Sequence, residues 1–210
     1  MKRIACLSQK GGVGKSSLTR LLATEFLLAD YFVKVVDMDI RQTTTAEWAS
    51  RRKEMELPTV PVVVAASPRE ALAIDGADVV VIDGKPFSDT HALELAKSVD
   101  LILLPTATSL DDLNPQIILA NDMVAGGVPR ENIMFVVYGF ITSGAGGAEV
   151  EAVREYIGKA GYQVARTAIG TRLSYINALN AGLSLSEVQH KGCKRVAQQL
   201  VEDVFQKVFP

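Results

Sequence analysis

Short apolar runs alternate along the chain with segments whose apolar residues recur every three or four positions. The runs are rich in Val, Ile and Leu and predict strands at residues 3–8, 31–39, 61–67, 77–83, 99–105 and 131–140. The periodic segments predict helices at residues 16–29, 43–55, 90–98, from about 113, at 147–160 and over most of the chain beyond 169. This alternation predicts an α/β fold: one mostly parallel, twisted sheet with helices on both faces.

Two other segments interrupt this alternation. Residues 162–169 are expected to be extended, and "TSGAGGAE" at 142–149 has the composition of a flexible insertion. No internal repeat divides the chain, and its 210 residues suffice for one well-buried core. We therefore predict a single domain over residues 1–210.

Composition narrows the class of protein. The net charge is −2, so the chain has no overall basic field of the kind that dedicated nucleic-acid-binding proteins carry. Its two cysteines, Cys6 and Cys193, lie far apart and indicate neither a metal knuckle nor a disulfide framework. The first residues lack the pattern of a secretory leader, and no apolar run approaches the ~18 residues that span a bilayer. We expect a cytoplasmic protein.

The stretch "QKGGVGKSS", Gln9 to Ser17, lies between the first strand and the first helix. It follows the phosphate-binding pattern G-x-x-x-x-G-K-[ST] except that Gln9 replaces the first glycine. Glycines allow successive N–H groups to face one centre, to which the following helix also presents its positive end. Lys15 can reach the β- and γ-phosphates, and the Ser16 hydroxyl can bind Mg²⁺. The residues expected to bind nucleotide are Gly11, Gly12, Val13, Gly14, Lys15, Ser16 and Ser17.

Acidic residues stand at the ends of two predicted strands. "VVDMDI" places Asp37 and Asp39 two residues apart, so that in an extended chain both carboxylates face the same way. "VVVIDG" places Asp83 after an apolar strand, where it could hold Mg²⁺ through a bound water. Ligands of such sheets bind beyond the carboxyl ends of the strands. These motifs make Ser16 and Asp83 the expected metal residues, and both Asp37 and Asp39 could face the phosphate end of the site.

These three motifs carry a family resemblance. "KGGVGKS", "VVDMD" and "VVVIDG" resemble the deviant Walker A, A′ and B motifs of ParA/MinD-type ATPases, a class of P-loop NTPases. "LILLPTATSLDDL" and "AIGTRLSYINALNAGLSLSE" are similar to later segments of the same family. Among its members, the chain most resembles the short ParA proteins that segregate plasmids, such as the ParF type.

The resemblance implies an ATP- and Mg²⁺-dependent ATPase that forms a homodimer with ATP between the subunits. Lys10, the additional lysine of the loop, would reach the partner's phosphates and, with Lys15 and Asp39, act in catalysis. Asp39 matches the water-positioning acid, and Asp37 lies beside it near the metal, which makes Asp37 a third expected metal residue with Ser16 and Asp83. Asp112 matches the Leu-Asp position of the family. Hydrolysis is expected to be slow and to be stimulated by an adaptor such as a ParB-like centromere-binding protein.

The sequence also departs from the family pattern. After Asp39 it reads "IRQ", with Arg41 before Gln42, where many relatives have Pro-Gln. Lys85 follows the Asp83 motif, and Tyr138 and Gly139 stand where an Asn or Arg often lies near the base. None of these departures removes an expected phosphate or metal ligand.

The resemblance to short ParA proteins also implies that the partner is DNA, bound without sequence preference in the ATP state, and that the protein is nucleoid-associated. Clustered cations could bind DNA phosphates, and the candidates are Arg166, Arg172, Lys191, Lys194 and Arg195. Membrane binding, as in MinD-like proteins, is disfavoured because the polar face of the last helix is not cationic. Two alternatives remain open: a ParA-like ATPase that positions a non-DNA cargo, and a metabolic ATP-dependent ligase.

Overall fold

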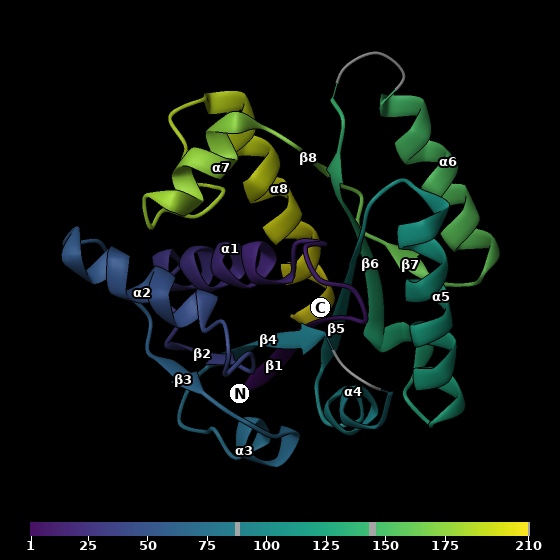
Figure 1. Ribbon diagram of the computed structural model, residues 1–210, viewed down its shortest axis with the longest axis horizontal. Helices are drawn as coiled ribbons and strands as arrows, with labels where there is room; N and C mark the ends of the chain where they lie inside the picture. The colour runs from purple at the N-terminus through teal and green to yellow at the C-terminus, as the bar shows by residue number, and fades with distance from the viewer. Residues whose placement is uncertain (87–88, 143–145, 210) are drawn as a thin grey trace.

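The computed structural model describes residues 1–86, 89–142 and 146–209, in which helices cover both faces of a central sheet (Figure 1). The strands are β1 (Lys2–Ser8), β2 (Val33–Asp37), β3 (Val62–Val64), β4 (Val79–Pro86), β5 (Leu101–Thr106), β6 (Ile133–Phe140), β7 (Gln163–Val164) and β8 (Ile169–Gly170). The α-helices are α1 (Lys15–Leu28), α2 (Thr44–Glu54), α3 (Pro68–Leu72), α4 (Asp89–Ala96), α5 (Leu110–Ala125), α6 (Gly146–Lys159), α7 (Leu173–Asn180) and α8 (Lys191–Val208). A short 3₁₀ helix, Arg130–Asn132, precedes β6.

The sheet has the strand order β3-β2-β4-β1-β5-β6-β7, and β8 pairs with β6. Every pairing described is parallel. The register sets Asp83 of β4 beside both Cys6 of β1 and Asp37 of β2. The carboxyl ends of three neighbouring strands therefore meet where the glycine loop leaves β1.

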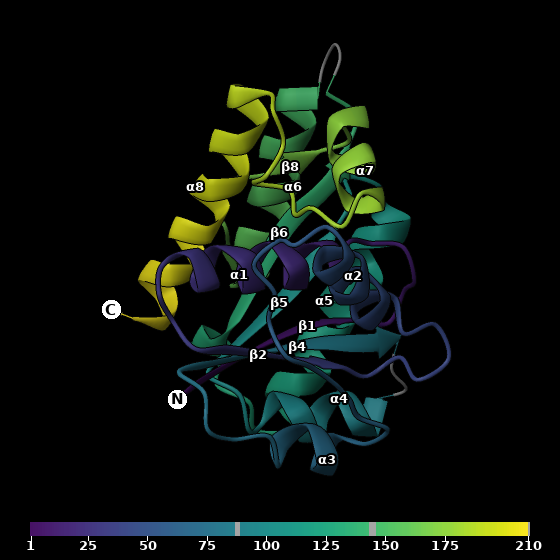
Figure 2. The ribbon, with the colours of Figure 1, turned by 90° about the vertical axis from the view of Figure 1, so that its left-hand side faces the viewer.

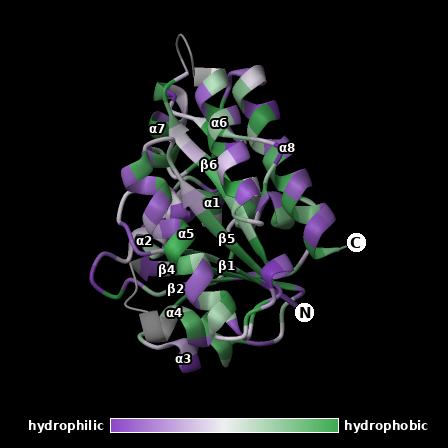
Figure 3. Cartoon of the chain, turned by 90° about the vertical axis from the view of Figure 1, so that its right-hand side faces the viewer, coloured by the Kyte–Doolittle hydropathy of each residue, from purple (hydrophilic) through white to green (hydrophobic). Residues whose placement is uncertain are grey.

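Each face of the sheet has its own apolar core, because successive side chains of a strand point to opposite faces. In β1, Ile4 and Cys6 pack with α1, α2, α7 and α8, whereas Ala5 and Leu7 pack with α3, α4, α5 and α6. In Figure 2, α1, α2, α7 and α8 lie above the central strands β1, β2 and β4, whereas α3 and α4 lie below them. In Figure 3 the central strands are hydrophobic along their length, as strands buried on both sides should be.

The predicted α/β fold with a parallel sheet is confirmed, with differences in several elements. The five-residue helix α3 was not predicted, and the extended segment at 162–169 resolves into two strands of two residues each. Helix α5 begins at Leu110 rather than near Leu113, because Ser109 caps it by accepting from the Asp112 N–H. Of the predicted insertion at 142–149, residues 143–145 lie outside the described part, and α6 already begins at Gly146.

The last helix packs on the domain's own core. Leu200, Val201 and Val204 of α8 are buried, and Phe205 lies against Phe26 of α1 and Tyr31. Its apolar face is thereby covered within the chain. Among the described residues, no helix has the length and apolar character needed to cross a membrane.

Candidate nucleotide-binding site

The glycine loop connects the end of β1 to the first residue of α1. Gly12 and Gly14 have φ angles of 76° and 106°, in the left-handed region that favours glycine. The Lys10 N–H donates to Ser8 Oγ at 2.9 Å and fixes the entry to the loop. The loop is thus a strand–turn–helix connection, with the amino end of α1 directed at its centre.

The two lysines of the loop have different environments. Lys15 is only 7% exposed, and its Nζ donates to the Lys10 carbonyl at 3.0 Å. Burial lowers the pKa of the Lys15 ammonium, while Asp83, Cys6 and Asp39 act in the opposite direction. Lys10 has a side chain that is 45% exposed and lies on the outside of the loop. Only Lys15 therefore has the surroundings of an inward-facing phosphate ligand.

Lys10 is bound by the amino end of α5. Its Nζ forms a 2.6 Å ion pair with Asp112 Oδ1 and donates to the Asp111 carbonyl at 3.0 Å. Asp112 also accepts from the Ser109 hydroxyl at 2.6 Å. Hydrogen bonds from Lys10 and Ser109 lower the pKa of the Asp112 carboxyl. The structure thus brings together the additional lysine and the predicted Leu-Asp residue within one chain.

Asp83 is a buried acid at the carboxyl end of β4. Its Oδ2 accepts from Thr45 Oγ1 at 2.6 Å, and Ser16 forms a further hydrogen bond to the carboxylate. Burial raises the pKa of Asp83 to about 6, although these hydrogen bonds act to lower it. The contact with Ser16 joins the predicted Walker B acid to the loop hydroxyl.

Asp37 and Asp39 differ in what they bind, although they are two residues apart. The Asp37 carboxylate accepts from the N–H groups of Asp39, Thr45 and Ala46 at 3.0–3.2 Å. It thereby caps α2, whose own N-cap residue, Thr43, makes no side-chain cap. Asp39 Oδ1 accepts from the N–H groups of Arg41 and Gln42, two and three residues further along the chain, each at 3.1 Å, and closes a tight turn.

The oxygen atoms at this site fit Mg²⁺, which prefers hard ligands and retains several waters. Ser16 and Asp83 supply a hydroxyl and a carboxylate that already contact each other. In the part of the chain that is described, no group of three or more His, Cys, Asp or Glu forms a metal cage. A magnesium ion at Ser16 and Asp83 would therefore take its other ligands from phosphate oxygens and water.

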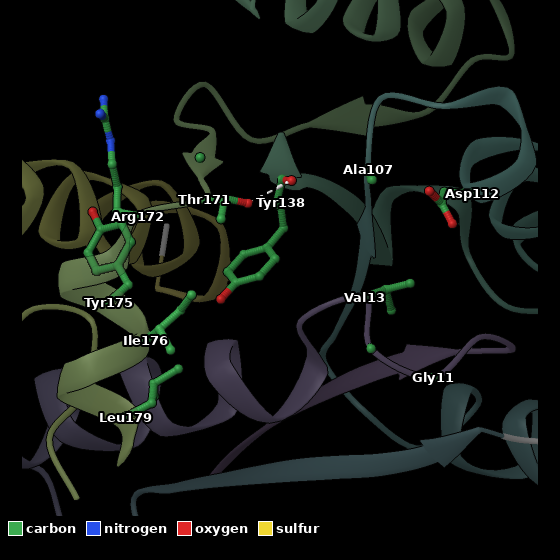
Figure 4. A pocket seen from close by; sticks show the side chains of 13 residues that line it. Gly11, Val13, Ala107, Asp112, Tyr138, Thr171, Arg172, Tyr175, Ile176 and Leu179 are labelled. Carbon is green, nitrogen blue, oxygen red and sulfur yellow. Dashed lines mark hydrogen bonds between the residues drawn. The ribbon is translucent and has the colours of Figure 1, made fainter. Parts of the chain in front are cut away.

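A cavity of about 340 Å³ opens beside the loop. Figure 4 shows Gly11, Val13, Ala107 and Asp112 on one side of it, and Tyr138 with residues of the β8–α7 segment on the other. The residues from this segment and α7 are Thr171, Arg172, Tyr175, Ile176 and Leu179. The cavity adjoins the glycines and has mixed polar and apolar walls, as a nucleotide-sized ligand requires.

The Tyr138 side chain lines the cavity, and its contact with the glycine loop was not predicted from the sequence. Its ring lies so close to the loop that a Cβ added at Gly14 would be 2.4 Å from the ring carbon Cδ1. Burial raises the pKa of the Tyr138 hydroxyl, which shares a hydrogen bond with Ser17. Gly14 is thus required both by its φ angle and by the Tyr138 ring.

The predicted DNA-binding cations do not form one equivalent set. Arg166 donates to Asp203 at 2.9 Å and to Gln206 at 2.8 Å, so its guanidinium is held against α8. The Arg166 side chain is nevertheless 73% exposed. The other four cations are also exposed but form no ion pair with the described residues. They lie at the amino ends of α7 and α8 and are Arg172, Lys191, Lys194 and Arg195.

Comparisons with known proteins identify the family and the fold. The model of the CobQ/CobB/MinD/ParA nucleotide binding domain matches residues 4–185. No curated protein matches the chain in sequence.

Several solved structures share the fold along nearly the whole chain. The septum site-determining protein MinD from Pyrococcus horikoshii, complexed with Mg-ADP, has a TM-score of 0.75 at 15% identity, covering 97% of this chain and 95% of that one. Apo McdA from Cyanothece has a TM-score of 0.73 at 16% identity, covering 97% and 99%. A plasmid partition protein from Borrelia burgdorferi, bound to AMPPNP, has a TM-score of 0.71 at 16% identity and covers 99% of each chain.

Proposed function

Because the chain belongs to the CobQ/CobB/MinD/ParA nucleotide-binding family, we propose that it is an Mg²⁺-dependent ATPase that dimerises with ATP and partitions DNA. The observation that carries this proposal is the pair of lysines in one loop. Lys15 is buried and directed inward, whereas Lys10 is exposed on the rim. One subunit needs only Lys15 to bind its own nucleotide. Lys10 would bind a phosphate of the nucleotide held by a second subunit.

Each residue has a distinct part in the proposed reaction. Lys15 and the loop N–H groups bind the phosphates, and bound Mg²⁺ would neutralise charge on them. Ser16 and Asp83 hold the metal, while Asp39 orients the attacking water from its turn after β2. Lys10 of each subunit neutralises charge on the partner's terminal phosphate as it leaves.

Dimerisation requires Lys10 to exchange one partner for another. Its ion pair with Asp112 in the lone chain must break before its ammonium can reach across to a second subunit. Asp112 lies at the mouth of the cavity, so the exchange would occur at the surface where the second subunit docks. ATP then acts mainly as a switch between monomer and dimer, and turnover is slow until an adaptor accelerates it.

The test is to measure mass and DNA retention with ATP, with ADP and without nucleotide. We expect dimers and salt-sensitive binding to DNA of arbitrary sequence only with ATP. Lys15→Ala should lose nucleotide binding itself. Lys10→Ala should still bind nucleotide as a monomer but form no ATP-dependent dimer, and dimers that persist in Lys10→Ala would overturn its assigned part.

Two other functions are compared with DNA partition, and the same experiment separates only one of them from it. An ATPase that positions a non-DNA cargo on the nucleoid would also dimerise and bind DNA, so its separation from DNA partition requires the cargo to be identified. A metabolic ligase would show neither ATP-dependent dimers nor DNA retention, and it would not need Lys10.

A further inference from the structure

Two buried polar side chains outside the glycine loop connect in series to Asp83. Arg20 of α1 donates from Nε to Thr45 Oγ1 at 3.2 Å, and Thr45 Oγ1 donates to Asp83 Oδ2 at 2.6 Å. All three residues are less than a tenth exposed. Burying a guanidinium costs free energy unless hydrogen bonds and an opposite charge compensate it. A series of this kind therefore destabilises the fold when one of its members loses its partner.

The hydroxyl of Thr45 gives the series a direction. A threonine hydroxyl has one proton, and because it accepts from Arg20 its own proton is left for Asp83. The Thr45 N–H donates to Asp37 Oδ2 at 3.0 Å. One residue thus contacts both strand-end acids and fixes how the Asp83 carboxylate is turned.

The same arginine also contacts the next turn of α2. The Arg20 guanidinium carbon lies 5.9 Å from the ring centroid of Trp48, and that of Arg52 lies 5.1 Å from it. The Trp48 indole N–H donates to the Leu183 carbonyl at 3.1 Å. Arg52 pairs with both carboxylate oxygens of Glu187, at 2.5 and 3.0 Å. Helix α2 is therefore held between Asp83 and the segment 182–187.

We propose that Arg20 and Thr45 are positioning residues of the Mg²⁺–nucleotide site: they hold the Asp83 carboxylate in one orientation and transmit its engagement with Mg²⁺ to Trp48. The inference rests on the proposed function, because it requires the chain to bind Mg²⁺ with a nucleotide. With Mg²⁺ bound beside Asp83, the carboxylate would change its contact with the Thr45 hydroxyl, and the hydroxyl and the Arg20 guanidinium would shift in turn. The position of the Arg20 charge relative to the Trp48 indole changes with them.

The test is a titration of Mg²⁺ into the metal-free protein with ADP, monitored by the emission of Trp48, the only tryptophan of the chain. We expect wild-type emission to shift as Mg²⁺ binds. Thr45→Val should raise the Mg²⁺ concentration at half-saturation about tenfold, the effect of losing one hydrogen bond to a charged group, and should abolish the emission shift. ADP affinity in EDTA, measured by calorimetry, should stay within about twofold of wild type.

Matched variants separate positioning from general damage. Thr45→Ser keeps the hydroxyl and should restore both readouts. Thr24→Val is the control, because Thr24 is an equally buried threonine of α1 whose hydroxyl has no partner among the described residues. If Thr45→Val does not fold, Arg20→Met tests the proposal instead, with the same two measurements: the Mg²⁺ concentration at half-saturation and the emission shift of Trp48.

Three outcomes are distinguishable. Wild-type protein that binds no Mg²⁺–ADP contradicts the proposed function itself. Wild-type protein that binds it while Thr45→Val and Arg20→Met show unchanged Mg²⁺ half-saturation overturns the positioning role alone. An equal loss of ADP affinity in EDTA would also overturn it, because the variants would then have damaged the loop rather than the orientation of Asp83.

Discussion

At the scale of single residues, the ion pair between Lys10 and Asp112 competes with any contact that Lys10 makes to a second subunit. The pair is partly exposed and of a kind worth about 0.2–1 kcal/mol. Two such pairs break for each dimer that forms. Asp112→Asn should therefore strengthen ATP-dependent dimerisation roughly 2- to 30-fold, measured by analytical ultracentrifugation with a non-hydrolysed ATP analogue.

A neighbouring acid provides the control for this prediction. Asp111 contacts Lys10 only through its backbone carbonyl, so Asp111→Asn removes the same charge from the same turn and keeps that contact. It should leave dimerisation close to wild type. A weaker dimer in Asp112→Asn would mean that Asp112 serves the dimer rather than the lone chain.

The raised pKa of Asp83 makes the stability of the nucleotide-free protein depend on pH. The value is about 6 in the folded chain against an ordinary 3.8, so the unfolded state ionises first. Stability therefore falls as the pH rises from about 4 to 6, by roughly 3 kcal/mol, and stays low above that range. Asp83→Asn removes this penalty, and in EDTA it should raise the melting temperature at pH 7.5 but not near pH 4. A gain of the same size at both pH values would contradict the prediction.

The sequence could predict which candidate residues lie close together when their positions depend only on where the strands end. Lys15, Ser16 and Asp83 are brought together because parallel strands place their carboxyl ends at one edge. Arg20 and Thr45 were not predicted, since one reads as an ordinary helix residue and the other as one of three successive threonines. Their meeting depends on how α1 and α2 pack, which no short motif records.

At the scale of elements, α2 depends on a carboxylate from the preceding strand. Asp37 accepts from three backbone N–H groups, two of them in the first turn of α2. Asp37→Ala leaves these buried donors without a partner and should lower the free energy of unfolding by about 2–4 kcal/mol. Urea denaturation measures this loss, and faster amide hydrogen exchange confined to α2 would locate it.

The comparison with Asp39 separates the structural and metal-binding interpretations of Asp37. Asp39 accepts from two N–H groups in a more exposed turn, so Asp39→Ala should cost less stability while slowing ATP hydrolysis. Unchanged stability in Asp37→Ala together with lost Mg²⁺ binding would assign Asp37 to the metal alone. The sequence alone favoured the metal, because it gave no sign that Thr43 leaves α2 without a side-chain cap.

The strands were predicted more accurately than the helices and their ends. The predicted strands at 77–83 and 99–105 contain the uninterrupted apolar runs 79–82 and 101–104, and a strand buried on both faces of the sheet is the structure that such runs favour. Helix α3 has only five residues, too few for a helical period to appear. The start of α5 did have a signal, since Ser109 stands three residues before the Asp112 N–H that it caps.

At the scale of the whole molecule, the nearly neutral charge of the chain leaves DNA binding to a local surface. Arg172, Lys191, Lys194 and Arg195 form exposed positive charge at the amino ends of α7 and α8. Replacing all four with Ala should weaken DNA binding of the ATP dimer and reduce the slope of log K against log salt by about 3–4 per subunit. The measurement is fluorescence anisotropy of a labelled duplex from low to moderate salt.

The position of each cation decides which controls are informative. Lys97 is exposed after α4, near the amino ends of the strands, so Lys97→Ala should leave the salt slope unchanged. Arg166 is held by Asp203 and Gln206, so Arg166→Ala should affect stability more than DNA binding. A wild-type slope in the fourfold variant, with ATP-dependent dimers intact, would place the DNA surface elsewhere. A lost slope caused by lost dimers would instead show that Arg172, which also lines the cavity beside the loop, acts at the subunit interface.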